Sequence, residues 1–115
     1  MPTTLFGINN CDTIKRTKKW LDAHSIEYEF HDYKKLGCSK QLIQQFMGYF
    51  DHEQLINRRG TTWRKLPESV KNSLDASSAV ELMIDQPSMI KRPLIQHQGK
   101  VLLGYNEQDL TDLFT

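Results

Sequence analysis

The stretch T-L-F-G-I-N-N-C-D-T, residues 4–13, indicates how the chain begins to fold. Its first half, Thr4–Ile8, is a short apolar run of the kind that forms buried strands. Two asparagines interrupt that run, and helix-forming residues with one apolar side then extend from Thr13 to His24. The stretch therefore predicts a strand, a turn and a helix, with Cys11 in the turn that joins them.

The segments outside this stretch continue the alternation of strands and helices. Residues 26–33 alternate apolar and polar side chains, which is the period of a half-buried strand. A strand, a helix and a second strand form a right-handed crossover, so these two strands are expected to run parallel. Near the other end, Pro93 precedes two further strands, 94–97 and 100–103, that form a hairpin, and a helix over 106–114 follows.

The middle of the chain, about 39–86, is predicted to be mostly helical. Its expected elements are a helix capped by Ser39 and running to about Phe50, short helices at 51–56 and 68–74, a loop at 57–64, and a helix that Ser77 or Ser78 caps and that ends before Pro87. The predicted architecture is one α/β domain, 1–115, with a four-stranded mixed sheet and a helical insertion between the second and third strands. This is the thioredoxin arrangement with an insertion.

Composition excludes several classes of protein. The 115 residues include 15 Lys+Arg and 14 Asp+Glu, a net charge of +1, which argues against a nucleic-acid-binding role. No apolar run approaches the roughly 18–20 residues that span a bilayer, and the first ten residues do not resemble a secretory signal. Two cysteines do not make a disulfide framework, and four scattered histidines do not predict a metal site. We expect a cytoplasmic protein with reduced thiols that binds neither membrane nor nucleic acid.

Cys11 is the candidate reactive residue. The start of a helix gathers unpaired N–H groups and the positive end of the helix dipole, which stabilise a thiolate and lower its pKa. Lys15 and Arg16, one turn further on, add positive charge. The competing interpretation is that Cys11 is a small apolar filler, as many lone cysteines are.

The second cysteine does not follow in a C-x-x-C pattern, because residue 14 is isoleucine. A dithiol cycle within this motif is therefore excluded. Cys38 lies in the turn before the second helix and is interpreted as a structural residue, with a distant resolving thiol as the alternative. A single nucleophilic thiol needs an external thiol to complete a redox cycle, and glutathione is the abundant cytosolic candidate.

The motif around Cys11 and four further motifs are spread over nearly the whole chain. The matching segments are G-I-N-N-C-D-T-I-K with W-L at 20–21, Y-E-F-H-D-Y at 28–33, N-R-R-G-T-T-W-R-K-L at 57–66 and P-S-M-I-K-R-P at 87–93. In these motifs, their order and their spacing, the sequence resembles the arsenate reductase-like (ArsC/Spx) family, and within it the small YffB-type branch. The resemblance implies a thioredoxin fold whose active cysteine ends the first strand–helix loop, which is the position of Cys11.

The resemblance also implies roles for arginines and for one proline. Pro93 matches the position of a cis-proline beside the catalytic thiol, and Arg92 matches an arginine that family arsenate reductases use before it. A second family arginine lies in the middle loop, where the match is ambiguous between Arg58 and Arg59, and we favour Arg59. Asn10 either orients a ligand beside the thiol or only forms the turn. A third family arginine, after the last hairpin strand, has no counterpart in Lys100–Tyr105, which weakens arsenate as the substrate.

Three functional hypotheses follow from the residues and the resemblance. The first is a glutathione-dependent thiol reductase, with Cys11 as nucleophile, Arg59 and Arg92 binding the glutathione carboxylate or substrate anion, no bound cofactor, and glutathione as co-substrate. The second is an arsenate reductase linked to glutathione and glutaredoxin. The third is an Spx-like transcription regulator that binds RNA polymerase, since Gly48 lies where such regulators contact their partner. The missing C-x-x-C switch argues against this third hypothesis. A protein with the fold and no catalytic activity is the remaining alternative.

Overall fold

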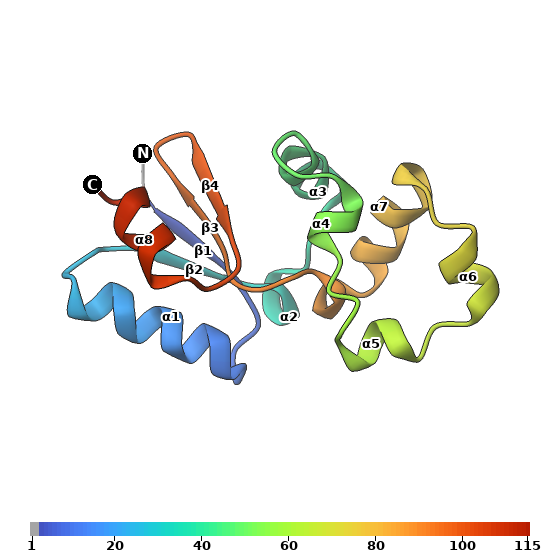
Figure 1. The fold of residues 1–115 in the computed structure, drawn as a ribbon, viewed down its shortest axis with the longest axis horizontal. Helices are drawn as coiled ribbons and strands as arrows, with labels where there is room; N and C mark the ends of the chain where they lie inside the picture. The colour runs from blue at the N-terminus through green and yellow to red at the C-terminus, as the bar shows by residue number, and fades with distance from the viewer. Residues whose placement is uncertain (1–2) are drawn as a thin grey trace. The chain divides into compact units, whose positions relative to one another are not determined.

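The computed structural model describes residues 3–115, which form two compact units. The first unit combines the described residues up to Leu36 with Arg92–Thr115, and the second unit consists of Gly37–Lys91. The first unit thus comes from the two ends of the chain, and the second is the segment inserted between them (Figure 1). The helical insertion predicted over about 39–86 falls within the second unit.

The first unit is built on one four-stranded sheet. Its elements are β1 (Thr4–Gly7), α1 (Asp12–Ala23), β2 (Glu29–Asp32), α2 (Tyr33–Leu36), β3 (Leu94–His97), β4 (Lys100–Leu103) and α8 (Glu107–Leu113). The strand order is β2-β1-β3-β4, with β1 parallel to β2 and antiparallel to β3, while β3 and β4 form a hairpin. This mixed sheet confirms the predicted α/β, thioredoxin-like fold and the parallel first pair of strands.

One predicted strand is shorter than the sequence pattern indicates. The alternation covers residues 26–33, but β2 contains only Glu29–Asp32. The amide of Ile26 donates instead to the carbonyl of Leu21 at 3.0 Å, where the chain leaves α1. Ser25 has a φ of 55° and completes this turn at the end of the helix. At the other end of the strand, Tyr33 begins the short helix α2.

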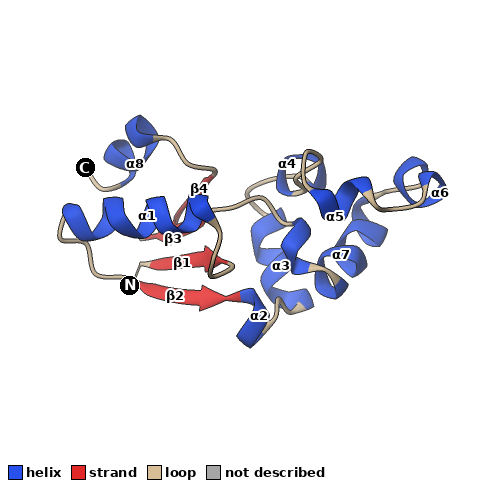
Figure 2. Cartoon of the chain, turned by 90° about the horizontal axis from the view of Figure 1, so that it is seen from below, coloured by secondary structure: helices blue, strands red, loops and turns tan. Residues whose placement is uncertain are grey.

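The core of the first unit lies between the sheet and the two helices α1 and α8. Its fully buried side chains come from all these elements and are Leu5, Ile14, Leu21, Ile95 and Leu110. Both helices therefore cover the same face of the sheet (Figure 2). Gly7 permits α1 to approach closely, because a Cβ at this position would overlap the Ile14 side chain and lie 3.9 Å from Arg92 Cδ. The absence of a side chain at Gly7 thus brings the start of α1 and Arg92 near the end of β1.

The second unit is helical. Its elements are α3 (Lys40–Met47), α4 (His52–Leu55), α5 (Thr61–Arg64), α6 (Glu68–Asn72), α7 (Ala76–Asp85) and the 3₁₀ helix η1 (Pro87–Met89). Buried side chains such as Ile43, Phe46 and Met83 join α3 to α7. A single antiparallel bridge between Ile56 and Ile90 closes the unit. Among the helices described in residues 3–115, none is both long and apolar enough to span a membrane.

Two predictions for this unit are wrong. The predicted loop at 57–64 contains α5, whose Thr62 hydroxyl lies 3.1 Å from the hydroxyl of Ser88 in η1, a contact between residues distant in sequence. The last long helix is capped by Asp75 rather than by Ser77 or Ser78. The Asp75 carboxylate accepts from the Ser78 amide at 2.8 Å, and the Ser78 hydroxyl bonds the Asp75 amide at 2.9 Å. Ser78 is therefore the reciprocal member of a capping box, not the cap.

Candidate functional site

Cys11 lies between β1 and α1, at the N-cap position of the helix. Its backbone is extended, and its carbonyl accepts the first helical hydrogen bond from the Lys15 amide at 2.9 Å. Asn10, just before it, is exposed and has a φ of 68°, a left-handed conformation that asparagine adopts more readily than most residues. This turn leaves the thiol partly exposed, and it lies at the start of α1, where the sequence predicts it.

The surroundings of Cys11 lower the pKa of its thiol. Partial burial raises the pKa of the thiol, but the backbone N–H groups of Ile14 and Thr13 and the guanidinium of Arg92 lower it, and the net pKa lies below the ordinary value of 9.0. Cys11 does not form a conventional side-chain capping hydrogen bond. The first-turn amides nevertheless face the sulfur, and the fully buried Ile14 side chain fixes this turn against the core.

Arg92 is brought to Cys11 from the other end of the sequence. Its guanidinium donates a hydrogen bond to the sulfur and stabilises negative charge there. The Arg92–Pro93 bond is cis, as the family resemblance implies. The Pro93 carbonyl accepts from the amide of Gly104 at 2.8 Å, one step beyond the last pair of the hairpin. Cys11 and Arg92–Pro93 thus lie together in the first unit. The hydrogen bond from Gly104 to Pro93 holds the residue after β4 beside them.

The two arginines predicted from the middle loop belong to the second unit. Both side chains are exposed. The guanidinium of Arg58 lies over the ring of Trp63, 5.3 Å from its centroid, whereas the Arg59 amide donates to the Asn57 side chain at 3.1 Å. Arg59 stays the favoured arginine of this loop. Its participation in the Cys11 site stays a prediction.

Cys38 differs from Cys11 in every property that governs reactivity. It is a free thiol that is 4% exposed, in the second unit, and burial raises its pKa to about 12. A thiol with this pKa is almost wholly protonated at neutral pH and is a poor nucleophile. These properties agree with the prediction that Cys38 is structural.

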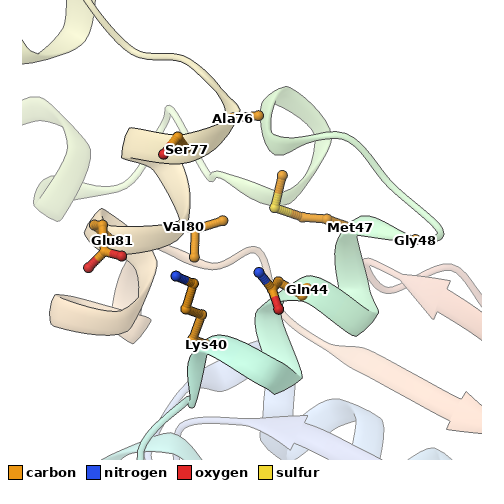
Figure 3. Close-up of a pocket in the computed structure, with 8 residues that line it drawn as sticks. All are labelled: Lys40, Gln44, Met47, Gly48, Ala76, Ser77, Val80 and Glu81. Atoms are coloured by element: carbon orange, nitrogen blue, oxygen red, sulfur yellow. The ribbon is translucent and has the colours of Figure 1, made fainter.

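A groove of about 470 Å³ lies between α3 and α7 in the second unit. Figure 3 shows Met47 and Val80 at its apolar centre, with Lys40 on one side and Glu81 on the other. Gly48 at the end of α3 completes the lining, and a Cβ added there would lie 3.2 Å from the Gln45 carbonyl. The groove thus combines two apolar side chains with polar and charged ones, and it contains Gly48, which the family resemblance implies lies in a region of partner contact.

The site and the fold together define a thioredoxin-like protein with one cysteine, rather than a pair, at the start of its first helix. The chain belongs to the ArsC family, whose model matches residues 6–113. An uncharacterized protein of Haemophilus influenzae is 44% identical over 111 residues, which cover 96% of this chain and 97% of that protein. The global transcriptional regulator Spx of Streptococcus agalactiae is 28% identical over 93% of this chain and 79% of its own.

Two solved structures are similar over nearly their whole length. The YFFB protein is 40% identical, with a TM-score of 0.94 over 98% of this chain and 99% of its own. An arsenate reductase (ArsC) related protein from Brucella melitensis is 47% identical, with a TM-score of 0.80 over 99% of this chain and 95% of its own. These similarities confirm the family that the sequence motifs indicated.

Two contacts near the site were not predicted. The bond from Gly104 to Pro93 could have been read from the hairpin register, since Leu94 pairs with Leu103. The second contact places the Arg16 guanidinium over the ring of Tyr105, 5.5 Å from its centroid. No sequence signal pairs these two residues, because the position of Arg16 in its helix does not show which distant residue packs against its side chain.

Arg92→Ala is expected to raise the pKa of Cys11, because the substitution removes a hydrogen bond and a positive charge from the thiolate. The rate of alkylation by iodoacetamide should therefore rise with pH at a higher midpoint than in the wild type. The free energy of unfolding also depends on this pKa. Because the pKa of Cys11 is lower in the folded than in the unfolded protein, ionisation of the thiol stabilises the fold at high pH. This stabilising contribution is lost as the pH falls through the folded-state pKa.

The matched control for this variant is Arg64→Ala, which removes an exposed arginine from the second unit. It should leave the alkylation midpoint unchanged. An Arg92→Ala protein that is folded by circular dichroism and has the wild-type midpoint would show that Arg92 does not govern the thiol.

Proposed function

We propose that this protein is a glutathione-dependent thiol reductase that uses Cys11 as its single nucleophile. The observation that supports the proposal most directly is the contact between the Arg92 guanidinium and the Cys11 sulfur at the start of α1. A partly exposed thiol with a lowered pKa is equipped to attack a disulfide. The cytoplasm, where the glutathione pool is reduced, is the compartment that such a cycle requires.

The proposed reaction has two thiol–disulfide exchanges. The Cys11 thiolate attacks the glutathione sulfur of a mixed disulfide, an S–S bond forms between Cys11 and glutathione, and the substrate leaves as its thiolate. A second glutathione thiolate then attacks this intermediate, releases glutathione disulfide and restores the Cys11 thiolate. In the net reaction the substrate sulfur is reduced to a thiol, one reduced glutathione is oxidised and joins the glutathione released from the mixed disulfide as glutathione disulfide, and no bound cofactor is needed. Glutaredoxin is the other candidate for the second step.

The residues proposed to bind glutathione are those named from the sequence. Arg92 and Arg59 bind carboxylates, since a guanidinium matches their planar geometry. The backbone beside the cis Pro93 is proposed to bind next to the sulfur of the substrate thiol, and the exposed Asn10 is proposed to orient the ligand beside Cys11. Arg58 is the alternative to Arg59 in the same loop.

Intact-mass analysis after incubation with glutathione disulfide tests the proposal. We expect one glutathionyl adduct per chain, located by peptide mapping on Cys11 and removed by reduced glutathione. Reaction at Cys38, or no adduct at neutral pH, would contradict the proposed cycle.

Arsenate reduction is the second candidate, supported by the similarity to the ArsC-related protein of Brucella melitensis. In this reaction the Cys11 sulfur would bond to arsenic, and arsenate would lose one protonated oxygen as water. Glutathione would then attack the Cys11 sulfur, and arsenic would gain two electrons as a Cys11–glutathione disulfide forms. Glutaredoxin would return the enzyme to its thiol form.

Partner binding of the Spx type is the third candidate, and the groove between α3 and α7 favours it. The buried Ile14 in place of a second cysteine leaves this chain without the usual redox switch of such regulators.

Under this candidate, purified RNA polymerase binds the chain, and Gly48→Arg prevents binding because the arginine side chain fills the groove. Gln45→Arg is the matched control, since it adds the same charge to an exposed position of α3 that does not line the groove. Surface plasmon resonance with the two variants distinguishes the outcomes. Absence of binding by the wild-type chain would exclude the candidate.

A further inference from the structure

A second arginine of the first unit lies on α1, the helix that begins at Cys11. Arg16 lies five residues after Cys11, about 7.5 Å along the axis of α1. Helical side chains lean toward the N-terminus of their helix, so the long Arg16 side chain is directed back over the first turns. Its guanidinium lies over the Tyr105 ring, at 5.5 Å from the centroid.

The Tyr105 ring is held in place by contacts on both sides. Its hydroxyl donates to the Glu107 carboxylate at 3.2 Å, and its ring packs against the core of the first unit. The preceding residue, Gly104, donates its amide to the Pro93 carbonyl, next to Arg92. Arg16 and Arg92 are therefore linked to one another through Tyr105, Gly104 and Pro93, and Cys11 precedes the helix that bears Arg16.

The contact of Arg16 with the Tyr105 ring does not use the hydrogen-bond donors of the guanidinium, whose carbon lies 5.5 Å from the ring centroid. These N–H groups can therefore bind a carboxylate, whose planar geometry they match. In residues 3–115, Arg16 forms no ion pair with a carboxylate of the protein. A cation of this kind, on the helix that begins at the reactive thiol, is a suitable receptor for an anionic group of a substrate.

We infer that Arg16, oriented by Tyr105, is a specificity-determining residue of the Cys11 site and binds a carboxylate that the substrate bears several bonds away from its reacting sulfur. The inference rests on the proposed function and narrows it to one substrate class: peptide thiols and disulfides with carboxylates at their ends. Arg92 stabilises charge at the sulfur itself. Arg16 selects for the extended, anionic part of the molecule.

The test compares two disulfides that differ in charge. Glutathione disulfide bears terminal carboxylates, whereas bis(2-hydroxyethyl) disulfide is neutral. The second-order rate constant for reaction with Cys11 is measured for each by intact-mass analysis. For Arg16→Ala we expect a loss of roughly tenfold with glutathione disulfide, which corresponds to about 1.4 kcal/mol, and no change with the neutral disulfide.

Three further variants distinguish a specific role of Arg16 from a general effect of positive charge. Tyr105→Phe keeps the aromatic ring and should behave as wild type. Tyr105→Ala should lose the preference for glutathione disulfide over the neutral disulfide, as Arg16→Ala does. Lys19→Ala removes an exposed positive charge from the same helix and should change neither rate. Added salt should reduce the preference of the wild type for glutathione disulfide and have little effect on Arg16→Ala.

The outcomes distinguish the inference from the proposed function. A wild-type protein whose Cys11 does not react with glutathione disulfide overturns both. A reactive wild type with the same ratio of rates in Arg16→Ala overturns the inference alone. An equal loss in Arg16→Ala and Lys19→Ala also overturns it, because net charge would then explain the effect.

Discussion

Cys11→Ser is expected to reduce glutathione-linked disulfide reduction to the rate without enzyme, whereas a protein without Cys38 keeps most of its activity. The expectation follows from the ionisation of the two thiols. Interactions at the start of α1 hold the Cys11 pKa below its ordinary value, while burial raises that of Cys38 to about 12. Only the thiolate attacks a disulfide at a useful rate, and at any given pH a larger fraction of Cys11 than of Cys38 is ionised.

The choice of substitution at Cys38 affects how this experiment is read. Cys38 is 4% exposed, and a buried hydroxyl without a partner costs about 1–3 kcal/mol. Cys38→Ser is therefore expected to lower the melting temperature while the activity at 25 °C is retained. Cys38→Ala avoids the buried hydroxyl and is the better control for a structural role.

The measurement is the reduction of a glutathionylated substrate, followed through NADPH consumption by glutathione reductase. If Cys11→Ser and both Cys38 variants lose activity equally, while all remain folded, a Cys11–Cys38 disulfide cycle replaces the single-thiol mechanism. If Cys11→Ser retains activity, the proposed nucleophile is wrong.

Arsenate is expected to be a poor substrate, with slow or undetectable turnover when glutathione and glutaredoxin are supplied. An anionic thiolate must approach an anionic oxyanion, and this repulsion is offset only by cations close to both. In residues 3–115, Arg92 is the arginine whose guanidinium contacts the Cys11 sulfur. The segment at the end of β4 and just after it, where family arsenate reductases have a further arginine, contains Leu103, Gly104 and Tyr105.

Arg16 does not remove this deficit. Its guanidinium is stacked on Tyr105 and is inferred to bind a carboxylate some distance from the sulfur, whereas arsenate is compact and reacts directly at the sulfur. Loss of one preorganised contact to a developing oxyanion typically lowers a rate about 10²–10³-fold. We therefore expect the same protein preparation to react with glutathione disulfide and to reduce arsenate slowly.

The assay is arsenate-dependent NADPH consumption, with an established arsenate reductase as the positive control. A turnover number in the ordinary enzyme range, about 1–10³ s⁻¹, would contradict the prediction and make arsenate reduction the leading function. As a further check, Tyr105→Arg places a guanidinium after β4 and should increase arsenate turnover if cation number is the limiting factor.

Local sequence patterns were sufficient for most elements of the first unit. The hairpin strands, β3 and β4, have the bounds that the sequence predicts, and α1 differs from its prediction by one residue at each end. These elements follow from apolar periodicity and turn residues, which act between neighbours in the chain. The second unit was harder to predict, since α5 is joined to η1 by Thr62 and Ser88, which are far apart in sequence.

The position of the candidate nucleophile follows from residues 4–13 alone, because a strand and a helix in succession place Cys11 at the helix start. The absence of a dithiol is equally evident from Ile14. In contrast, the contact of Arg92 with the Cys11 sulfur and the stacking of Arg16 on Tyr105 depend on folding. Both contacts depend on the pairing of β3 with β1 and on the hydrogen bond from Gly104, after β4, to Pro93. These long-range interactions bring together residues that no local sequence pattern connects.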